Sequence, residues 1–541
     1  MRVLIPSAKA VPDELQALGK LPAVIYPVNG HTVFSYLYKQ YLGLSEIEVL
    51  CYENAGKVHK KLEKYKDINI VDIPELRDLA HTIYYGLDGV DGVESVIINF
   101  GDTIVTDNIF DNESDCFYYS KDYVSDKWTY FDIENGVLRD IYDKKKLAVN
   151  SSIKKKLFVG VFYLADAQTF KKCLEIAFVN KNTSISAFYQ ALKLYSEIHC
   201  LNAIETLKWF DIGHADKYYN TRLEVKAREF NHIDIDRDRG ILTKYSKEKD
   251  KFIGEIKWYL KLPSDIEYVR PRIFDYSVDY NNPFVSMEYY AYHTVHELFL
   301  NGDLDIHQWE VIFEHIRFIC HDMKRYKVQD ENIKLSLEDM YLTKTTQRFE
   351  KLKKDDRFTN FFYSSISVNG KEYKSLNKVL DILNEKIPEM LYDVKNFNII
   401  HGDLCFTNMM LDNNFSFIKV IDPRGKFGSY DIYGDSRYEL AKLFHSVDGK
   451  YDYIIKDLFD LTYENGEINY SIQDKDREFD LYPVFRKVFK DEIGKDLKKI
   501  ELIEALLFLS MIPLHCESFE HQLVMLGTGL EILNRIVNVE E

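Results

Sequence analysis

The segment HGDLCFTN, His401 to Asn408, decides how the second half of this chain is interpreted. Asp403 lies five residues before Asn408, and Asp422 follows fourteen residues later at the end of the apolar run IKVID. This spacing suits phosphoryl transfer, because one Asp orients the attacking hydroxyl while Asn and Asp oxygens hold Mg²⁺. We therefore expect Asp403 to be the catalytic base and Asn408 and Asp422 to bind magnesium.

Two charged residues upstream extend this pattern. Lys244 lies in the strand-like GILTKYS, and Glu255 follows eleven residues later in a helical segment. Such a pair holds a Lys against the α- and β-phosphates of ATP. The strand-like PFVSMEYY then offers Met287, Glu288 and Tyr289 as the segment that contacts adenine. Each feature alone has an ordinary structural explanation, but the order and spacing of the charged and amide residues together favour an ATP site.

These motifs resemble the aminoglycoside phosphotransferase and choline kinase family over residues 226–541. The resemblance implies a two-lobed protein-kinase-like domain, with a small lobe at about 226–292 and a helical lobe at about 293–541. It also implies ATP, Mg²⁺ and phosphorylation of a small-molecule hydroxyl. One departure is that no G-x-G-x-x-G precedes Lys244. A protein kinase is disfavoured because no A-P-E-like segment follows Asp422.

The first 225 residues alternate strand-like and helix-like segments. MRVLIP, EIEVLCY and VESVIINFGD read as strands, and TVFSYLYKQYLG and LRDLAHTIYYGL read as helices. This alternation predicts an α/β, Rossmann-like domain with a mostly parallel sheet and helices on both faces. Ligands of such sheets bind at the carboxyl ends of strands, where Gly101 and Asp102 lie.

Several of these segments resemble sugar-phosphate nucleotidyltransferases. They are LPAVIYPVNGHTVFSYL, INFGDTIV, the hairpin-like FDIENGVLRDIYDKK, FVGVFYL and KWFDIGHADKYYNTR. The resemblance covers about residues 1–225. It implies that Asp102 and Asp211 hold Mg²⁺ and that Lys144 or Lys145 neutralises charge during transfer. Gly101 belongs to the same substrate-binding segment.

The start of the chain departs from this family. A glycine-rich loop with an Arg is expected there, but PSAKAVPDELQALGK has no glycine before Gly19. Lys9 and Lys20 are the candidates for the missing positive charge. Two hypotheses therefore stand: an active nucleotidyltransferase, or an inactive domain that serves as a binding module.

The composition of the chain indicates which classes of partner it is expected to bind. It has 541 residues and a net charge of -17, which indicates several domains and disfavours nucleic acid and anionic lipid as partners. Its seven cysteines are scattered without a CxxC, so we expect a reducing, cytoplasmic setting. No apolar run reaches the length of about 18 residues that membrane insertion needs.

The leading hypothesis is a bifunctional enzyme. ATP phosphorylates a sugar, polyol or amino alcohol, and a second nucleoside triphosphate, CTP or another, then activates the phosphate for surface polysaccharide or capsule biosynthesis. The alternative is a small-molecule kinase with an inactive amino-terminal domain. The sequence leaves the acceptor, the nucleotide and the oligomeric state open.

Overall fold

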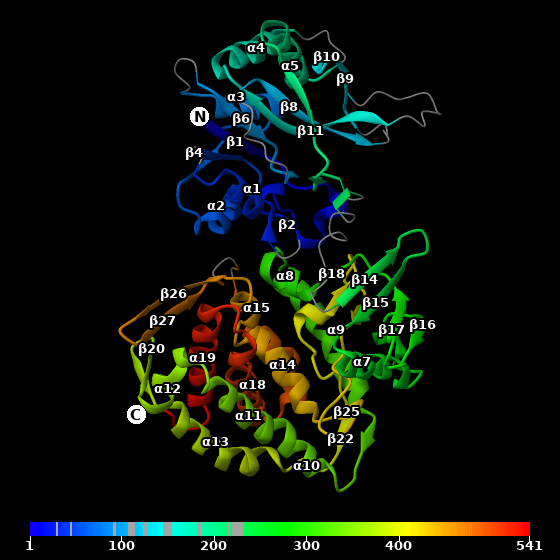
Figure 1. Cartoon of the computed structure of the whole chain (residues 1–541), viewed down its shortest axis with the longest axis vertical. Helices are drawn as coiled ribbons and strands as arrows, with labels where there is room; N and C mark the ends of the chain where they lie inside the picture. The colour runs from blue at the N-terminus through cyan, green and yellow to red at the C-terminus, as the bar shows by residue number, and fades with distance from the viewer. Residues whose placement is uncertain are drawn as a thin grey trace. The chain divides into compact units, whose positions relative to one another are not determined.

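The computed structural model describes residues 1–28, 31–43, 46–89, 94–106, 114–122, 128–143, 154–180, 185–214, 217–218, 231–474, 477 and 479–541. The chain divides into two compact units, Met1–Lys226 (unit 1) and Ala227–Glu541 (unit 2), which are described separately (Figure 1). The domain boundary expected at residues 225 and 226 lies outside the described residues.

Unit 1 is built on a nine-stranded sheet, with strand order β5-β4-β1-β6-β11-β8-β12-β10-β9. The described strands are β1 (Arg2–Ser7), β2 (Pro27–Val28), β3 (His31–Thr32), β4 (Glu46–Cys51), β5 (Ile68–Asp72), β6 (Val96–Asn99), β7 (Thr103–Val105), β8 (Cys116–Asp122), β9 (Tyr130–Glu134), β10 (Val137–Tyr142), β11 (Lys155–Leu164), β12 (Asn202–Glu205) and β13 (Trp209–Asp211). The described helices are α1 (Val33–Tyr41), α2 (Ala55–Leu62), α3 (Leu79–Gly86), α4 (Ala167–Val179) and α5 (Ala187–Ile198), with short 3-10 turns η1 (Asp13–Leu18) and η2 (Ala23–Ile25).

The central strand β1 is buried on both faces, which explains its continuous apolar sequence. Helices α3, α4 and α5 pack on one face and share a core with the sheet (Figure 1). From β1 the chain moves outward to β4 and β5 and then returns to β6 on the other side of β1. The carboxyl ends of β1 and β6 therefore form the switch point at which open α/β sheets bind ligands.

The prediction of a mostly parallel sheet is only partly right. Strands β5, β4, β1 and β6 are parallel, but β11 is antiparallel to both β6 and β8. Beyond them, β9 and β10 form the predicted hairpin. Its turn is Asn135-Gly136, and both residues have positive φ. Asn-Gly fits such a turn because both residues tolerate the left-handed region.

Unit 2 opens with a four-stranded antiparallel sheet of order β14-β15-β17-β16, beside which lies α7 (Lys249–Lys261) (Figure 1). The strands are β14 (Asn231–Asp236), β15 (Ile241–Ser246), β16 (Ile273–Ser277) and β17 (Phe284–Glu288). The sequence placed strands and a helix in this order. Side chains on one face of α7 are buried, including Phe252, Glu255 and Trp258.

The rest of unit 2 is mainly helical, and α14, α18 and α19 lie together in it (Figure 1). Its helices are α8 (Val295–Asn301), α9 (Ile306–Lys324), α10 (Ile333–Leu337), the π-helical η4 (Glu338–Thr343), α11 (Lys344–Leu352), α12 (Thr359–Tyr363), α13 (Leu376–Leu391), α14 (Ser436–Val447), α15 (Tyr451–Ile454), α16 (Leu481–Val488), α17 (Lys490–Ile493), α18 (Leu497–Met511) and α19 (Phe519–Asn534). Its strands are β18 (His293–Thr294), β19 (Lys327–Val328), β20 (Ile366–Val368), β21 (Lys371–Tyr373), β22 (Phe397–Ile399), β23 (Met409–Leu411), β24 (Ile418–Val420), β25 (Tyr433–Gly434), β26 (Phe459–Glu464) and β27 (Glu467–Ile472).

The resemblance implied a helical lobe at about 293–541, so the four-stranded sheet of order β21-β20-β27-β26 was not predicted. It consists of two hairpins. Their turns are Asn369-Gly370 and Asn465-Gly466, and all four residues have positive φ. The dipeptide Asn-Gly between polar-apolar alternations was the available signal.

The apolar stretch near residue 505 forms α18, which is buried along most of its length. Over the ranges described above, no helix combines the length and apolarity needed to cross a membrane.

Candidate functional sites

Asp403 and Asn408 lie in one loop of unit 2, between β22 and β23. The Asn408 amide Nδ2 donates to the Asp403 backbone oxygen at 2.9 Å and to its Oδ2 at 3.2 Å. Because Nδ2 is used in this way, the amide oxygen is the Asn408 atom suited to a cation. The 3-10 turn Phe406–Asn408 brings the two side chains together.

Glu439 supports this loop from α14. Its two carboxylate oxygens accept the backbone N–H groups of His401 and Gly402, each at 2.8 Å. His401 accepts the Asp403 N–H at Nδ1, and its Nε2 bonds the Ile421 carbonyl. Burial lowers the pKa of His401 to about 4, so this ring stays neutral. These contacts make Glu439 a structural support of the loop that carries Asp403.

Lys442, one turn after Glu439 on α14, was missed by sequence reasoning. Its ammonium lies 2.8 Å from Asp403 Oδ1. Burial raises the pKa of Asp403, but Lys442 and Arg424 outweigh it and lower that pKa to about 2. Asp403 is therefore ionised throughout the neutral range and is suited to orienting a hydroxyl. A lysine within a helical pattern gives no sequence signal for this contact.

Lys244 and Glu255, which are buried, form a charge network with the partly exposed Asp422. The Lys244 Nζ donates to both Glu255 oxygens at 2.9 Å and to Asp422 Oδ1 at 2.8 Å. Burial lowers the pKa of Lys244, but the carboxylates of Asp422 and Glu255 outweigh it and raise that pKa. The sequence-predicted pair is thus in contact, and it also reaches the residue predicted to bind magnesium.

Helix α7 fixes the backbone around these groups. Trp258 Nε1 donates to the Ile400 carbonyl at 2.7 Å, and the Asp422 N–H donates to the Tyr259 hydroxyl at 3.0 Å. Asp422 has a φ of 56°, a left-handed conformation that is unfavourable for a residue other than glycine. The surrounding bonds hold this strained backbone and so determine where the carboxylate lies.

The three residues predicted to contact adenine lie at the end of β17 and just beyond it. Met287 pairs with Leu242 of β15, one strand away from Lys244. The N–H groups of Glu288 and Tyr289 already donate to the carbonyls of Arg272 and Gly240. These two amides are therefore not offered to a base, and any contact from this segment uses other groups.

Asp102 and Asp211 come together in unit 1 through the pairing of β7 with β13. Asp211 lies opposite Thr103 in this ladder, and the Ile212 N–H donates to the Asp102 carbonyl. Gly213 lies between the two carboxylates, since a Cβ there would be 2.6 Å from Asp102 Oδ2 and 3.3 Å from Asp211 Oδ1. Only a residue without a side chain allows this approach.

The carboxylates of this pair lie close enough to repel each other, and His214 offsets part of that repulsion. Desolvation and the Asp211 carboxylate raise the pKa of Asp102 to about 6. Asp211 accepts from the Gly213 N–H at 3.0 Å and from His214 Nδ1 at 2.7 Å. Two adjacent carboxylates that repel each other fit Mg²⁺, which prefers oxygen ligands. In unit 2, the Ile421 N–H donates to the Asn408 backbone carbonyl at 2.9 Å, so Asn408 and Asp422, the residues predicted to bind magnesium, belong to neighbouring backbone segments.

A cavity of about 960 Å³ opens beside Asp102. Its wall includes Ser7 at the end of β1, Phe100 after β6, and the aromatic pair Trp128 and His214. The rings of Trp128 and His214 lie 4.1 Å apart. Its position is the strand switch point at which a nucleotide is expected. Trp128 was missed because a lone tryptophan carries no pattern.

The predicted substrate-binding residues of unit 1 differ in their position relative to the cavity. Lys9 lines the cavity, whereas Lys20 is exposed and is not among the lining residues. Gly101 is buried against Ser7 and donates its N–H to the Pro6 carbonyl. Lys144 and Lys145 lie outside the described residues.

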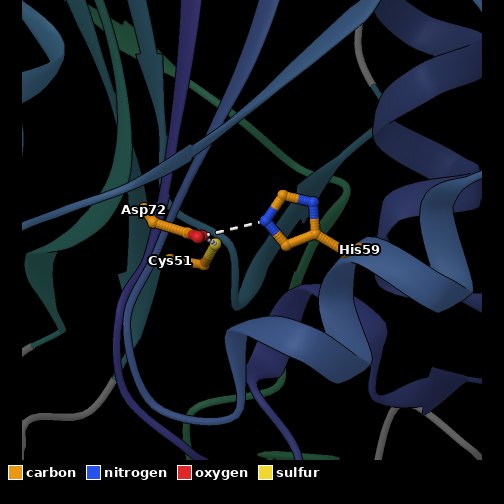
Figure 2. Close-up of side chains that lie close together, drawn as sticks. All are labelled: Cys51, His59 and Asp72. Carbon is orange, nitrogen blue, oxygen red and sulfur yellow. Dashed lines mark hydrogen bonds and ion pairs between the residues drawn. The ribbon is translucent and has the colours of Figure 1, made fainter.

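A separate cluster joins Cys51, His59 and Asp72 (Figure 2). Asp72 Oδ1 lies 3.1 Å from Cys51 Sγ and 2.9 Å from His59 Nε2. Burial raises the pKa of the Cys51 thiol to about 12, which opposes the thiolate that zinc requires. Its donors are satisfied within the cluster, so it needs no ion.

No protein-family model matches the chain, and no curated protein matches it. Among solved structures, a glucose-1-phosphate thymidylyltransferase from Bacillus anthracis is similar over 42% of this chain and 96% of its own, with 14% identity and a TM-score of 0.34. A CTP:phosphocholine cytidylyltransferase from Streptococcus pneumoniae is similar over 42% and 99%, also with 14% identity and a TM-score of 0.34. An inositol-1-phosphate CTP transferase from T. maritima is similar over 42% and 97%, with 15% identity and a TM-score of 0.31. At these values the likeness carries no argument about function, which rests on the geometry above.

Proposed function

We propose that this chain is a bifunctional enzyme. Unit 2 transfers the γ-phosphoryl group of ATP to the hydroxyl of a small sugar, polyol or amino alcohol. Unit 1 then joins that phosphate to the nucleotidyl group of a second nucleoside triphosphate, CTP or another. The product is an activated precursor of the kind consumed in surface polysaccharide or capsule biosynthesis.

The kinase step is supported by two groups of residues from distant parts of the sequence. Lys244 contacts Glu255 and Asp422, and Asp403 contacts Asn408. Asp403 orients the acceptor hydroxyl and receives its proton as the oxygen attacks the γ-phosphorus and ADP leaves. Lys244, held by Glu255, is placed to bind the α- and β-phosphates. Bound Mg²⁺ on Asp422 and Asn408 supplies charge neutralisation at the phosphates.

The nucleotidyl transfer is supported by the adjacent carboxylates of Asp102 and Asp211 beside the cavity. In this step an oxygen of the acceptor phosphate attacks the α-phosphorus of the triphosphate, and pyrophosphate leaves. Mg²⁺ on this pair would supply the charge neutralisation. Trp128 and His214 offer a flat aromatic surface in the cavity for a base or a sugar.

The test is mass spectrometry of reaction mixtures. The full chain is given Mg²⁺, ATP, the other nucleoside triphosphates and an acceptor panel, beside Asp403→Asn and Asp102→Asn. We expect wild type to form a phosphorylated acceptor and its nucleotide derivative, Asp403→Asn to form neither, and Asp102→Asn to form only the first. A nucleotide derivative made equally by Asp102→Asn contradicts the assignment of unit 1.

A second candidate is a kinase whose unit 1 binds nucleotide without transferring it. The segment after β1 favours this reading, because the Ala10 N–H donates to the Glu53 carboxylate at 2.9 Å. The Ala10 N–H is therefore not available to a triphosphate, and the Glu53 carboxylate would repel one. A glycine-rich loop, as in the family that this unit resembles, would instead offer its free N–H groups to the phosphates. Formation of a phosphorylated acceptor without any nucleotide derivative supports this candidate.

A further inference from the structure

Positive charge gathers around Asp403 on the side of the helical part of unit 2. Lys344 and Arg348 lie one turn apart on α11, so they share a helix face. Arg424 follows Asp422 by two residues. We call these three residues the cationic cluster. None of them belongs to the predicted ATP or magnesium residues.

The cationic cluster has no acidic partner within hydrogen-bonding distance in the described parts of unit 2. Arg348 donates to the Ser510 carbonyl on α18 at 3.0 Å, and Arg424 donates to the Tyr438 hydroxyl at 3.1 Å. Both acceptors are neutral. Lys344 has neither an ion pair nor a hydrogen bond among those residues. This differs from the buried Lys244, which contacts two carboxylates.

Backbone and side-chain contacts place Arg424 beside the loop that carries Asp403. The Arg424 N–H donates to the His401 carbonyl at 2.9 Å, and a Cβ on Gly402 would lie 2.9 Å from the Arg424 Cβ. Burial, then Arg424, Arg348 and Lys442, lower the pKa of Lys344 to about 6, and Asp403 opposes this. The nearby carboxylate of Asp403 is already bound to Lys442 at 2.8 Å. Lys442, Arg348 and Arg424 therefore share one carboxylate, and an anion that joined them would also favour the protonated form of Lys344.

The surroundings of Asp403 are otherwise neutral or apolar. Glu439 is turned to the backbone of His401 and Gly402, and burial raises its pKa to about 7. The aromatic rings of His445 and Tyr451 lie 4.2 Å apart beyond Lys442. Within the described parts of unit 2, Glu439 is bound to backbone amides and Asp452 to His296, so neither carboxylate is offered to an ammonium acceptor.

We propose that the acceptor alcohol carries an anionic group, a carboxylate or a phosphate, which the cationic cluster binds while Asp403 orients the hydroxyl. This inference rests on the proposed kinase function and narrows its substrate class. It excludes simple amino alcohols such as ethanolamine, because their ammonium would face the guanidinium groups of Arg348 and Arg424. According to this proposal, the acceptor already carries a negative charge before unit 2 phosphorylates it.

The experiment compares acceptors that differ in charge but not in size. The full chain is assayed for ADP formation with glycerol, glycerate and 2-amino-1,3-propanediol, and with glucose, gluconate, glucose 6-phosphate and glucosamine. Rates in Asp403→Asn are subtracted. We expect kcat/KM to favour an anionic member over its neutral counterpart by roughly 10- to 100-fold, the effect of one or two charged hydrogen bonds. Gluconate against glucose 6-phosphate separates a carboxylate from a phosphate.

Lys344→Met tests the cluster directly, because Lys344 holds no structural bond that its loss would break. We expect this variant to raise KM for the anionic acceptor about 10-fold or more and to leave KM for ATP within about twofold of wild type. Lys351→Met, on the exposed side of the same helix, is the matched control and should behave like wild type. A rise in KM for ATP instead of the acceptor overturns the proposal.

Two further outcomes overturn it: preference for the neutral or the cationic member, or an unchanged preference in Lys344→Met. If no acceptor supports ADP formation that depends on Asp403, the proposed kinase function fails on this panel. The cationic cluster is then tested by measuring anion binding alone. Inorganic phosphate is then titrated calorimetrically in the presence of Mg-ADP, which fills the nucleotide's own phosphate positions. Binding that Lys344→Met weakens supports an anion site, and equal or absent binding removes it.

Discussion

The two candidate sites use the same residue types and balance their charges in opposite ways. In unit 2, Asp403 has Lys442 at 2.8 Å and Asp422 has Lys244 at 2.8 Å. In unit 1, Asp102 lies beside another carboxylate, and its pKa rises to about 6. One site pairs its carboxylates with lysines of the chain, whereas the other brings two carboxylates together, an arrangement that suits a divalent cation.

This difference predicts that the two sites affect the stability of their units in different ways. A balanced site is preorganised and stable before substrates arrive. An unbalanced site destabilises its own domain until a metal binds, as is common where function opposes stability. Four substitutions test the contrast, in order of decreasing effect.

Asp403→Asn removes the group that orients the hydroxyl and should have the largest effect. We expect the rate of acceptor phosphorylation to fall by roughly 10²–10⁴-fold, the usual contribution of a positioned base. Nucleotidyl transfer from a supplied phosphorylated acceptor should be unchanged, which a separate pyrophosphate-release assay measures. A parallel fall in both activities would mean that the two sites are not independent.

Asp102→Asn should lower nucleotidyl transfer by roughly 10²–10³-fold while stabilising metal-free protein. The pKa of Asp102, about 6, lies above its ordinary 3.8. The folded state thus binds this proton more tightly than the unfolded state. The protonated Asp102 therefore adds to the free energy of unfolding below about pH 4, and this contribution is lost as the pH rises through 6. At about 1.4 kcal/mol per unit, the wild-type penalty at neutral pH is at most about 3 kcal/mol.

Calorimetric unfolding in EDTA checks this prediction. The variant should unfold at a higher temperature than wild type at pH 7.5 and at the same temperature near pH 4. Added Mg²⁺ should stabilise wild type more than the variant. A variant that is less stable at pH 7.5 would show that the Asp102 charge is balanced after all.

Gly213→Ala places a Cβ 2.6 Å from Asp102 Oδ2 and must displace the carboxylate pair. We expect nucleotidyl transfer to fall about 10- to 100-fold, as small misplacements of reacting groups do. Phosphorylation by unit 2 should not change. Gly56→Ala is the matched control, because a Cβ there meets nothing within 4 Å. Equal activity of the two variants would remove Gly213 from the site.

Lys442→Met should have the mildest effect, a shift in pH dependence. Lys442 lowers the pKa of Asp403, so its loss should raise that pKa toward 3.8. The acid limb of kcat/KM for phosphorylation then moves to higher pH by about one to two units. Lys442→Arg keeps the charge and should keep the wild-type profile. An unmoved limb in Lys442→Met would show that another group controls it.

The sequence predicted the parts of both sites that depend on fixed spacing. Lys244 and Glu255 are eleven residues apart and do meet, because a strand followed by a helix brings them together. Asp403, Asn408 and Asp422 are placed by one loop and one strand end. Such local geometry is encoded in spacing along the chain.

The sequence did not predict contacts between distant elements. Lys442 reaches Asp403 from α14, and Trp128 reaches His214 across unit 1. These contacts depend on packing that no local pattern records. The hairpins at Asn369-Gly370 and Asn465-Gly466 were missed for a different reason. Their signal was present, but the helical patterns around them outweighed it.

The bonds from Trp258 and Tyr259 have a consequence for how unit 2 opens. They tie α7 to Ile400 and to Asp422, which lie at the ends of β22 and β24. The helix therefore cannot detach without releasing the segments that carry Asp403 and Asp422. Amide protons of α7 should exchange with solvent at the rate of those of β22, so Lys244 and Asp403 would lose their positions together in one cooperative step.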